Sequence, residues 1–289
     1  MLELNLDAVR QSLKQWLDED IGTGDITTMA TIPPDHRSKG IIHAKDSGII
    51  AGLPVAEAVF ALVDERLKFF GRVKEGQRVQ PGTILAEVEG PTRGILLGER
   101  LALNLMQRMS GIATRTREMV DALQGLPARL VDTRKTTPGH RILEKYAVRV
   151  GGGHNHRFGL FDAVLIKDNH IKGAGGIANA IEASRRQIPH TMKIEVEVES
   201  REQLLEALEA GADIIMLDNM SVPEMREAVN LIKSRAPHVT VEASGNVTLE
   251  TVREIASAGV DVISVGRLTY SVRALDISLD LNDRKEVKP

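Results

Sequence analysis

The chain has 289 residues and a net charge of −3, with 42% hydrophobic and 27% charged residues. This length allows one large barrel or two ordinary domains, and the composition is that of a globular protein. The negative charge argues against general binding to nucleic acid or to an anionic membrane. The absence of cysteine excludes disulfides, thiolate metal sites and a cysteine nucleophile, and it fits a cytoplasmic location.

The N-terminal segment is expected to form an amphipathic helix rather than a secretory signal. Its apolar residues recur at helical spacing, with charged residues between them, at Leu6, Val9, Leu13 and Leu17. The longest apolar stretch, 49–63, contains a proline and a glutamate and is too short to span a bilayer. We therefore expect no membrane partner.

The region that follows is expected to be mostly β, with short apolar runs separated by turn residues. The expected strands are 40–45, 67–73 and 83–89, and a helix is expected at about 55–63. A longer helix, roughly 96–123, leads out of this region.

From about residue 130, short apolar strands alternate with helices. The clearest strands are expected at 193–198, 214–217, 239–243 and 262–265. Capping-box pairs mark two of the helix starts, at Ser200 with Gln203 and at Ser221 with Glu224.

An internal repeat supports a parallel sheet. The segment 210–215 resembles 258–263, which lies 48 residues further along, or two strand–helix units. A closed barrel and an open doubly wound sheet both satisfy this pattern. The barrel is favoured because no Gly-x-Gly-x-x-Gly turn follows the first strand.

In such a barrel the functional residues lie at the carboxyl ends of the strands. The expected strand ends carry cations first, carboxylates next and glycines last, at 132–135, 167–170, Glu197, 218–219, 244–246 and 266–267. Segment 134–172 alone holds eight Lys or Arg against three acids, and four of the eight histidines. A focused anion site explains this clustering, and a solvated basic face is the alternative.

The carboxylates Glu197 and Asp218 end successive expected strands. Two carboxylates suit Mg²⁺ held partly through substrate oxygens or water, and they suit ribose hydroxyls equally well. Asp218 could instead cap the following helix. Glu195 shares the alternating face of Glu197, so the pattern does not settle which acid reaches the site.

The glycines come at the last two strand ends. Ser244 and Gly245 lead into a helix, and Gly266 follows the last strand. Backbone N–H groups at such turns bind phosphate, and barrels often place phosphate sites after their late strands. A plain turn is the alternative interpretation.

Taken together, these segments resemble the quinolinate phosphoribosyltransferases, also called carboxylating nicotinate-nucleotide pyrophosphorylases. The resemblance runs almost the whole length of the chain. It rests on segments 19–28, 98–100 with Asn104, 110–114, 132–139, 151–157, 167–170, 195–198, 217–219 and 242–246.

The resemblance implies an α/β chain of two domains. Residues 1–115 would form an α/β open sandwich joined by the C-terminal tail 272–289, and residues 116–271 an incomplete (β/α) barrel. The implied reaction joins quinolinate to phosphoribosyl pyrophosphate (PRPP) with Mg²⁺, and gives nicotinate mononucleotide, pyrophosphate and CO₂ for NAD biosynthesis. The resemblance also implies a homodimer, and the sequence leaves open whether dimers assemble further.

The resemblance also implies roles for individual residues. The quinolinate pocket would be lined by Arg134, His156, Arg157, Lys167 and the partner subunit's Arg100. The groups acting on PRPP and Mg²⁺ would be Lys135, Glu197 and Asp218, with Ser244, Gly245 and Gly266 near its phosphates. The family usually has a histidine in segment 268–271, where this chain has Tyr270, whose hydroxyl can still donate a hydrogen bond.

Three other interpretations compete with this one. A zinc hydrolase would use His154, His156 and Lys167. A non-catalytic anion-binding barrel has no need of the full set of cations, acids and phosphate loops. A relative that uses nicotinate, a monocarboxylate, would need fewer cations than Arg100, Arg134, Arg157 and Lys167 provide together, so the dicarboxylate quinolinate is favoured.

Overall fold

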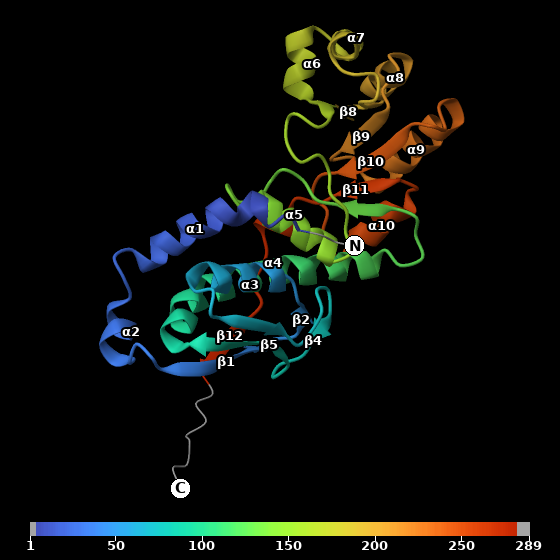
Figure 1. Ribbon diagram of the computed structural model, residues 1–289. Coiled ribbons are helices and arrows are strands. Elements are labelled where there is room, and N and C mark those ends of the chain that lie inside the picture. The colour runs from blue at the N-terminus through green and yellow to red at the C-terminus, as the bar shows by residue number, and fades with distance from the viewer. Residues whose placement is uncertain (1–3, 282–289) are drawn as a thin grey trace. The chain divides into compact units, whose positions relative to one another are not determined.

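The computed structural model describes residues 4–281 and divides into two compact units (Figure 1). The first comprises the described parts of Met1–Arg117, Thr137–Gly152 and Ser271–Pro289, and the second comprises Glu118–Thr136 and Gly153–Tyr270. Compared with the expected boundaries, segment 137–152 lies in the first unit rather than in the barrel. Residues 282–289 of the expected tail lie outside the described residues.

The first unit is built on an antiparallel sheet with strand order β12-β1-β5-β3. Its strands are β1 (Arg37–Ala44), β3 (Lys68–Gly71), β5 (Ile84–Pro91) and β12 (Ile277–Leu281), and a small separate sheet pairs β2 (Gly48–Ile49) with β4 (Arg78–Val79). Its helices are α1 (Asp7–Ile21), α2 (Ile26–Thr31), α3 (Leu53–Val63), α4 (Thr92–Ala122, whose last turn enters the second unit) and α5 (Arg141–Val150).

The expected elements of this unit are present with shifted ends. Helix α1 buries Val9, Leu13 and Leu17, which is the apolar stripe that its spacing predicts. Strand β1 buries Ile42 and Ala44, which lie two positions apart on one face of the sheet. Helix α2 was not expected, because its six residues are too few to show a periodic pattern.

Helix α5 belongs to the first unit because its polar groups are paired there. The Tyr146 hydroxyl donates to the Glu75 carboxylate at 3.0 Å, and that carboxylate also accepts from the backbone N–H groups of Gly52 and Leu53. Arg108 donates to the buried Glu144 at 2.8 Å. Burial raises the pKa of Glu75, although these three hydrogen bonds oppose the shift. Such long-range pairing between side chains has no local sequence signal.

The second unit is an incomplete barrel, as expected. Its six parallel strands lie in the order β6-β11-β10-β9-β8-β7. They are β6 (Arg129–Val131), β7 (Val164–Ile166), β8 (Ile194–Val198), β9 (Ile214–Asp218), β10 (Thr240–Ser244) and β11 (Val262–Ser264). Successive strands pair in chain order from β7 to β11, and β6 pairs with β11. A closed ring would also require pairing of β6 with β7, and these are the two edges of the described sheet.

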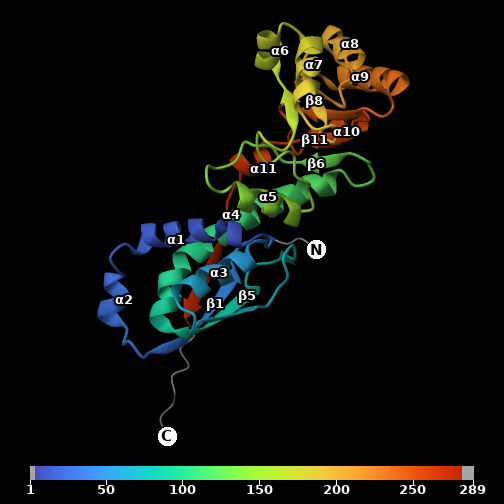
Figure 2. The ribbon, with the colours of Figure 1, turned by 45° about the horizontal axis from the view of Figure 1, so that its top comes forward.

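Helices follow the strands of this unit (Figure 2). They are α6 (Asp168–Ala174), α7 (Ile177–Gln187), α8 (Arg201–Glu209), α9 (Val222–Arg235), α10 (Val252–Ser257) and α11 (Arg267–Tyr270). Ser200 accepts from the Gln203 N–H at the start of α8, and Ser221 and Glu224 form a reciprocal capping box at α9. Since Ser221 caps α9, Asp218 is not needed for that purpose.

Among the described residues, no helix combines the length and the apolar character needed to cross a membrane.

The close approach of α4 to the C-terminal segment gives a stability prediction. A Cβ atom on Gly111 would overlap the Arg273 carbonyl oxygen, which belongs to the backbone and cannot rotate away. We expect Gly111→Ala to lower the free energy of unfolding by about 1–3 kcal/mol in urea denaturation. Gly173→Ala is the matched control, because a Cβ on this helical glycine would meet no atom within 4 Å. Equal stability of the two variants would contradict this packing.

Candidate active site

Polar side chains from most of the barrel strand ends line two adjoining hollows. The first is lined by Arg134, Lys135, His156, Arg157, Lys167 and Ser244, among others. The second is lined by Lys135, Lys167, Glu197, Asp218, Ser244, Gly245, Gly266 and Tyr270, together with Asn219, Asn246 and Arg267. The hollows share Lys135, Lys167 and Ser244, so they form one continuous site. Every barrel residue that the sequence placed at the site lines one or both hollows.

Arg100 lies elsewhere, on α4 of the first unit. Its side chain is 59% exposed, and its Nη2 atom lies 4.0 Å from the Glu99 carboxylate. An exposed arginine on this helix is available to another molecule, but its donation to a partner's site remains a prediction.

The first hollow gathers cationic side chains. Burial lowers the pKa of Arg157, and the neighbouring positive charge of Arg134 lowers it further. The Nη1 atom of Arg157 donates to the Ala163 carbonyl at 3.0 Å, whereas its buried Nε has no hydrogen-bond partner among residues 4–281. Two guanidinium groups this close repel each other, so binding of an anion between them would be favourable.

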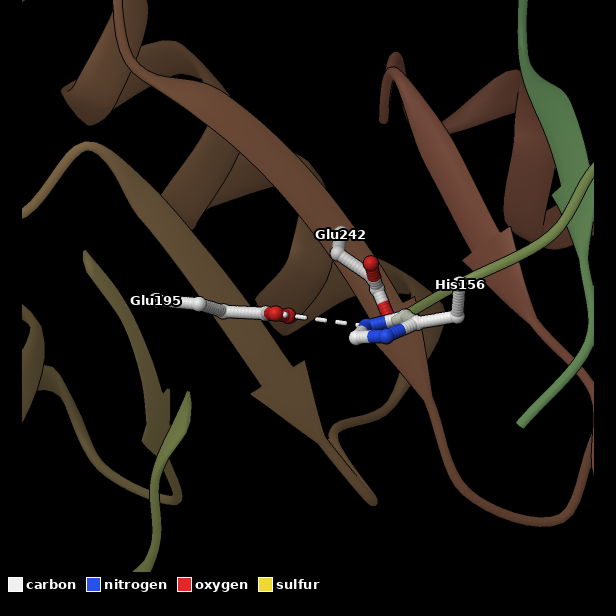
Figure 3. A group of neighbouring side chains, drawn as sticks. All are labelled: His156, Glu195 and Glu242. Carbon is white, nitrogen blue, oxygen red and sulfur yellow. Dashed lines mark ion pairs between the residues drawn. The ribbon is translucent and has the colours of Figure 1, made fainter. Parts of the chain in front are cut away.

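A buried pair of carboxylates lies against His156 (Figure 3). The His156 Nε2 atom lies 3.2 Å from a Glu195 oxygen and 3.5 Å from a Glu242 oxygen. Glu195 comes from β8 and Glu242 from β10, and both residues are only 3% exposed. The Glu195 Oε1 atom makes no hydrogen bond within the described part of the chain, whereas the Glu242 Oε1 atom is the one that faces His156.

Three groups fix the position of His156. Its backbone N–H donates to the buried Asp132 carboxylate at 2.9 Å, and its Nδ1 accepts from the Arg157 backbone N–H at 2.7 Å. The third group is the carboxylate pair at Nε2. The imidazole therefore links the interior of the barrel, through Glu195 and Glu242, to the backbone of Arg157.

We call His156, Glu195 and Glu242 the His156 cluster. Its imidazole binds a proton more tightly than an ordinary histidine does. Burial lowers the pKa of His156, but Glu195 and Glu242 outweigh burial and raise it to about 10. Burial also raises the pKa of Glu195. Because Nδ1 accepts a hydrogen bond from the Arg157 backbone N–H, the ring proton lies on Nε2, where it faces the two carboxylates. A proton at Nε2 between two carboxylates offsets part of the negative charge beside the anion pocket.

The zinc arrangement considered from the sequence does not form among the described residues. His154 is exposed, whereas His156 points toward the two glutamates. His156, Glu195 and Glu242 are close enough together to hold a metal ion. The adjacent guanidinium of Arg157, however, makes this a poor site for a cation.

The second hollow carries the remaining acids and the glycines. Glu197 forms an ion pair with Lys167, and Asp218 accepts from the Asn219 amide at 2.7 Å. A Cβ atom on Gly266 would lie 2.8 Å from the Tyr270 ring and 3.0 Å from the Lys135 side chain. The absence of a side chain at this position therefore lets Tyr270 and Lys135 approach each other at the rim.

The structure separates the roles of Glu195 and Glu197, which the strand pattern left open. Glu195 lies against His156, and Glu197 lines the second hollow. Sequence reasoning missed Glu242 as a site residue, and it placed Asn219 and Asn246 at strand ends without giving them a role. The position of Glu242, two residues before the strand end at Ser244, was a usable signal, because alternate residues face the same side of a strand.

The fold and the site together define an enzyme of the α/β-barrel class with an anion-binding mouth. The chain belongs to the quinolinate phosphoribosyl transferase family, whose N-terminal and C-terminal domain models match residues 25–110 and 112–280.

Similar proteins match this chain over nearly its whole length. A probable carboxylating nicotinate-nucleotide pyrophosphorylase of Synechocystis is 48% identical and covers 93% of this chain and 91% of its own length. A probable enzyme of the same name from Bacillus subtilis is 46% identical over 94% and 93% of the two chains. The crystal structure of NadC from Streptococcus pyogenes is 41% identical, with a TM-score of 0.91 over 97% of this chain and 99% of that one.

The His156 cluster makes stability depend on pH. A folded-state pKa of about 10, above the ordinary histidine value of 6.5, gives stability that is present below pH 6.5 and lost as the pH rises toward 10. Glu242→Gln removes one of the carboxylates responsible, so we expect the free energy of unfolding to fall less over this range than in the wild type. Glu227→Gln, an exposed carboxylate on α9, should retain the wild-type slope. Identical slopes in all three proteins would show that the cluster does not hold this proton.

Proposed function

We propose that the two hollows catalyse one reaction, in which PRPP and quinolinate form nicotinate mononucleotide, pyrophosphate and CO₂. One observation carries the proposal: a cationic hollow adjoins a second hollow lined by acids and glycines, and Lys135, Lys167 and Ser244 belong to both. Two different anions can therefore be held next to each other, as the reaction requires. A cytoplasmic location, expected from the absence of cysteine, is part of the same proposal.

The first hollow suits quinolinate. This acceptor has two adjacent carboxylates, so a productive pocket needs several converging donors, preferably arginines. Arg134, Arg157 and Lys167 supply three positive charges there. A monocarboxylate such as nicotinate would leave part of this charge unneutralised in a partly buried site, which favours the dicarboxylate.

The second hollow suits PRPP. Ser244, Gly245 and Gly266 present loop backbone near the phosphates, and Lys135 lies beside Gly266. Glu197 and Asp218 offer carboxylate oxygens, of which the Glu197 group is paired with Lys167. Two such carboxylates fit Mg²⁺ that is held mainly through substrate oxygens. When bound, the ion would neutralise charge that develops on the leaving pyrophosphate.

The chemistry asks mainly for positioning. The pyridine nitrogen of quinolinate is already nucleophilic, so no general base is needed for its attack. The bond from ribose C1′ to the pyrophosphate oxygen breaks, the bond from nitrogen to C1′ forms, and the protein holds the two anions in line. The ring nitrogen becomes cationic. The adjacent carboxylate then leaves as CO₂, its electron pair stays on the ring carbon, and a proton from water takes its place.

Product analysis tests the reaction. With Mg²⁺ and PRPP, we expect quinolinate to give nicotinate mononucleotide and CO₂ in equal amounts, and nicotinate to give little mononucleotide. Mononucleotide formed from nicotinate alone would assign the chain to the non-carboxylating reaction. Absence of product from both acids would overturn the proposal.

We also infer a homodimer in which the partner subunit's Arg100 completes the quinolinate pocket. The exposure of Arg100 on α4 supports this inference, as does the need for several cations around two carboxylates. Such an arrangement would be reciprocal, because a twofold dimer places the same residue in both sites.

Mixing two inactive variants tests the shared site. Arg100→Ala and Arg134→Ala should each lose about 3–5 kcal/mol of transition-state or substrate binding, by analogy with a broken buried ion pair. In a mixed dimer, one site has both arginines and the other has neither. An equal mixture, after subunit exchange, should therefore regain about a quarter of wild-type activity. No recovery despite demonstrated exchange would mean that Arg100 acts in its own subunit or has no role.

A further inference from the structure

Two residues of the second hollow have an unusual backbone conformation. Among the described residues, Asn219 (φ 53°) and Asn246 (φ 49°) are the only non-glycine residues with positive φ. Left-handed backbone is uncommon for residues with a side chain, although asparagine tolerates it better than most. Both residues line the same hollow, where they follow two neighbouring strands. Strained conformations of this kind cluster at functional sites.

The two asparagines are hydrogen-bonded to each other. The side-chain amide nitrogen of Asn246 donates to the side-chain oxygen Oδ1 of Asn219 at 3.2 Å. The backbone N–H of Asn219 donates to the backbone carbonyl of Ser244 at 3.0 Å. Together these bonds join the loop after β9 to the loop after β10. We call this pair of residues the asparagine bridge.

Gly245 makes room for the asparagine bridge. Its φ of 93° already favours glycine, and a Cβ atom there would overlap the side-chain amide of Asn219. The bridge therefore lies directly against the backbone of the Ser244–Gly245 turn, which the proposed function assigns to the phosphates.

The asparagine bridge also contacts Asp218, which the proposed function assigns to Mg²⁺. The Asn219 amide donates to Oδ2 of Asp218 at 2.7 Å. The side-chain nitrogen of Asn219 makes this bond, while the side-chain oxygen of the same residue accepts from Asn246. The bond to Asp218 fixes the orientation of the carboxylate, and each oxygen keeps a lone pair that a ligand can use.

We infer that Asn219 is a positioning residue for the pyrophosphate group of PRPP, acting with Asn246 to hold Asp218 and the Ser244–Gly245 turn in one fixed arrangement. The inference rests on the proposed function for its substrate. It predicts a selective effect: loss of the Asn219 side chain should weaken binding of the phosphate-bearing substrate and leave the cationic quinolinate hollow intact.

The variant Asn219→Gly isolates the side chain from the backbone. Glycine adopts a φ of 53° without strain, so the loop can keep its course while the amide is lost. Asn246→Gly removes only the far end of the bridge and leaves the bond from Asn219 to Asp218 in place. Asn219→Asp is the conservative variant, because it keeps the acceptor for Asn246 but loses the donor to Asp218.

Calorimetric titration with pyrophosphate and Mg²⁺ tests the inference without turnover. For Asn219→Gly we expect a Kd at least about tenfold above that of the wild type, as for the loss of a hydrogen bond to a charged group. Asn246→Gly should give a smaller increase, and Asn219→Asp should not restore wild-type binding. The Tm of Asn219→Gly should match the wild type, which separates positioning from loss of the fold. A Kd within twofold of the wild type would overturn the inference.

Steady-state kinetics separate this inference from the proposed function. If the wild type converts quinolinate, Asn219→Gly should raise KM for PRPP about tenfold and change KM for quinolinate less than about twofold. Equal increases in both KM values, with a lowered Tm, would show a merely structural role and overturn the inference. A wild type that makes no product would refute the proposed function, and the pyrophosphate titration would still decide the inference.

Discussion

The repulsion between the clustered cations of the barrel mouth is the constraint on which the rest of the site depends. Burial and the neighbouring positive charge of Arg134 lower the pKa of Arg157, and Lys167 and Lys135 line the same hollow. Such a cluster is tolerated when nearby negative charge offsets it. Glu195 and Glu242 of the His156 cluster provide part of that negative charge, and Glu197 pairs directly with Lys167. The substrate anions would complete the neutralisation.

The barrel supplies these groups because all its strands end on the same side. Glu195 and Glu197 lie two residues apart on one strand and share a face. Glu197 lines the second hollow, whereas Glu195 is buried against His156. Asp218 and Ser244 lie at matching positions of neighbouring strands. The loops that follow these strands are joined by hydrogen bonds between asparagines, so the order of the strands also sets the geometry of the second hollow.

Patterns in the sequence predicted much of this arrangement. The alternation of strands and helices gave the parallel sheet, and strand-end chemistry placed Arg134, Lys167, Asp218 and Gly245 at one mouth. These signals are local, since they depend on periodicity and caps. The family resemblance went further and supplied the substrates.

Other features depend on contacts between distant segments and had no local signal. Helix α5 lies in the first unit because Tyr146 meets Glu75, which is far away in the chain. The partnership of Glu242 with His156 requires the strand order to be known. The positive φ of Asn219 follows from its contacts across Gly245 and from no pattern in its own segment.

The central claim is that one mouth holds a dicarboxylate and a pyrophosphate group side by side. A crystal structure of the protein with quinolinate, Mg²⁺ and a non-reactive PRPP analogue tests this claim most directly. We expect the two carboxylates of quinolinate to contact Arg134 and Arg157, and the pyrophosphate group to lie against the Ser244–Gly245 turn, beside Asp218. Quinolinate bound away from both arginines, or a pyrophosphate group bound in the cationic hollow in its place, would contradict the account.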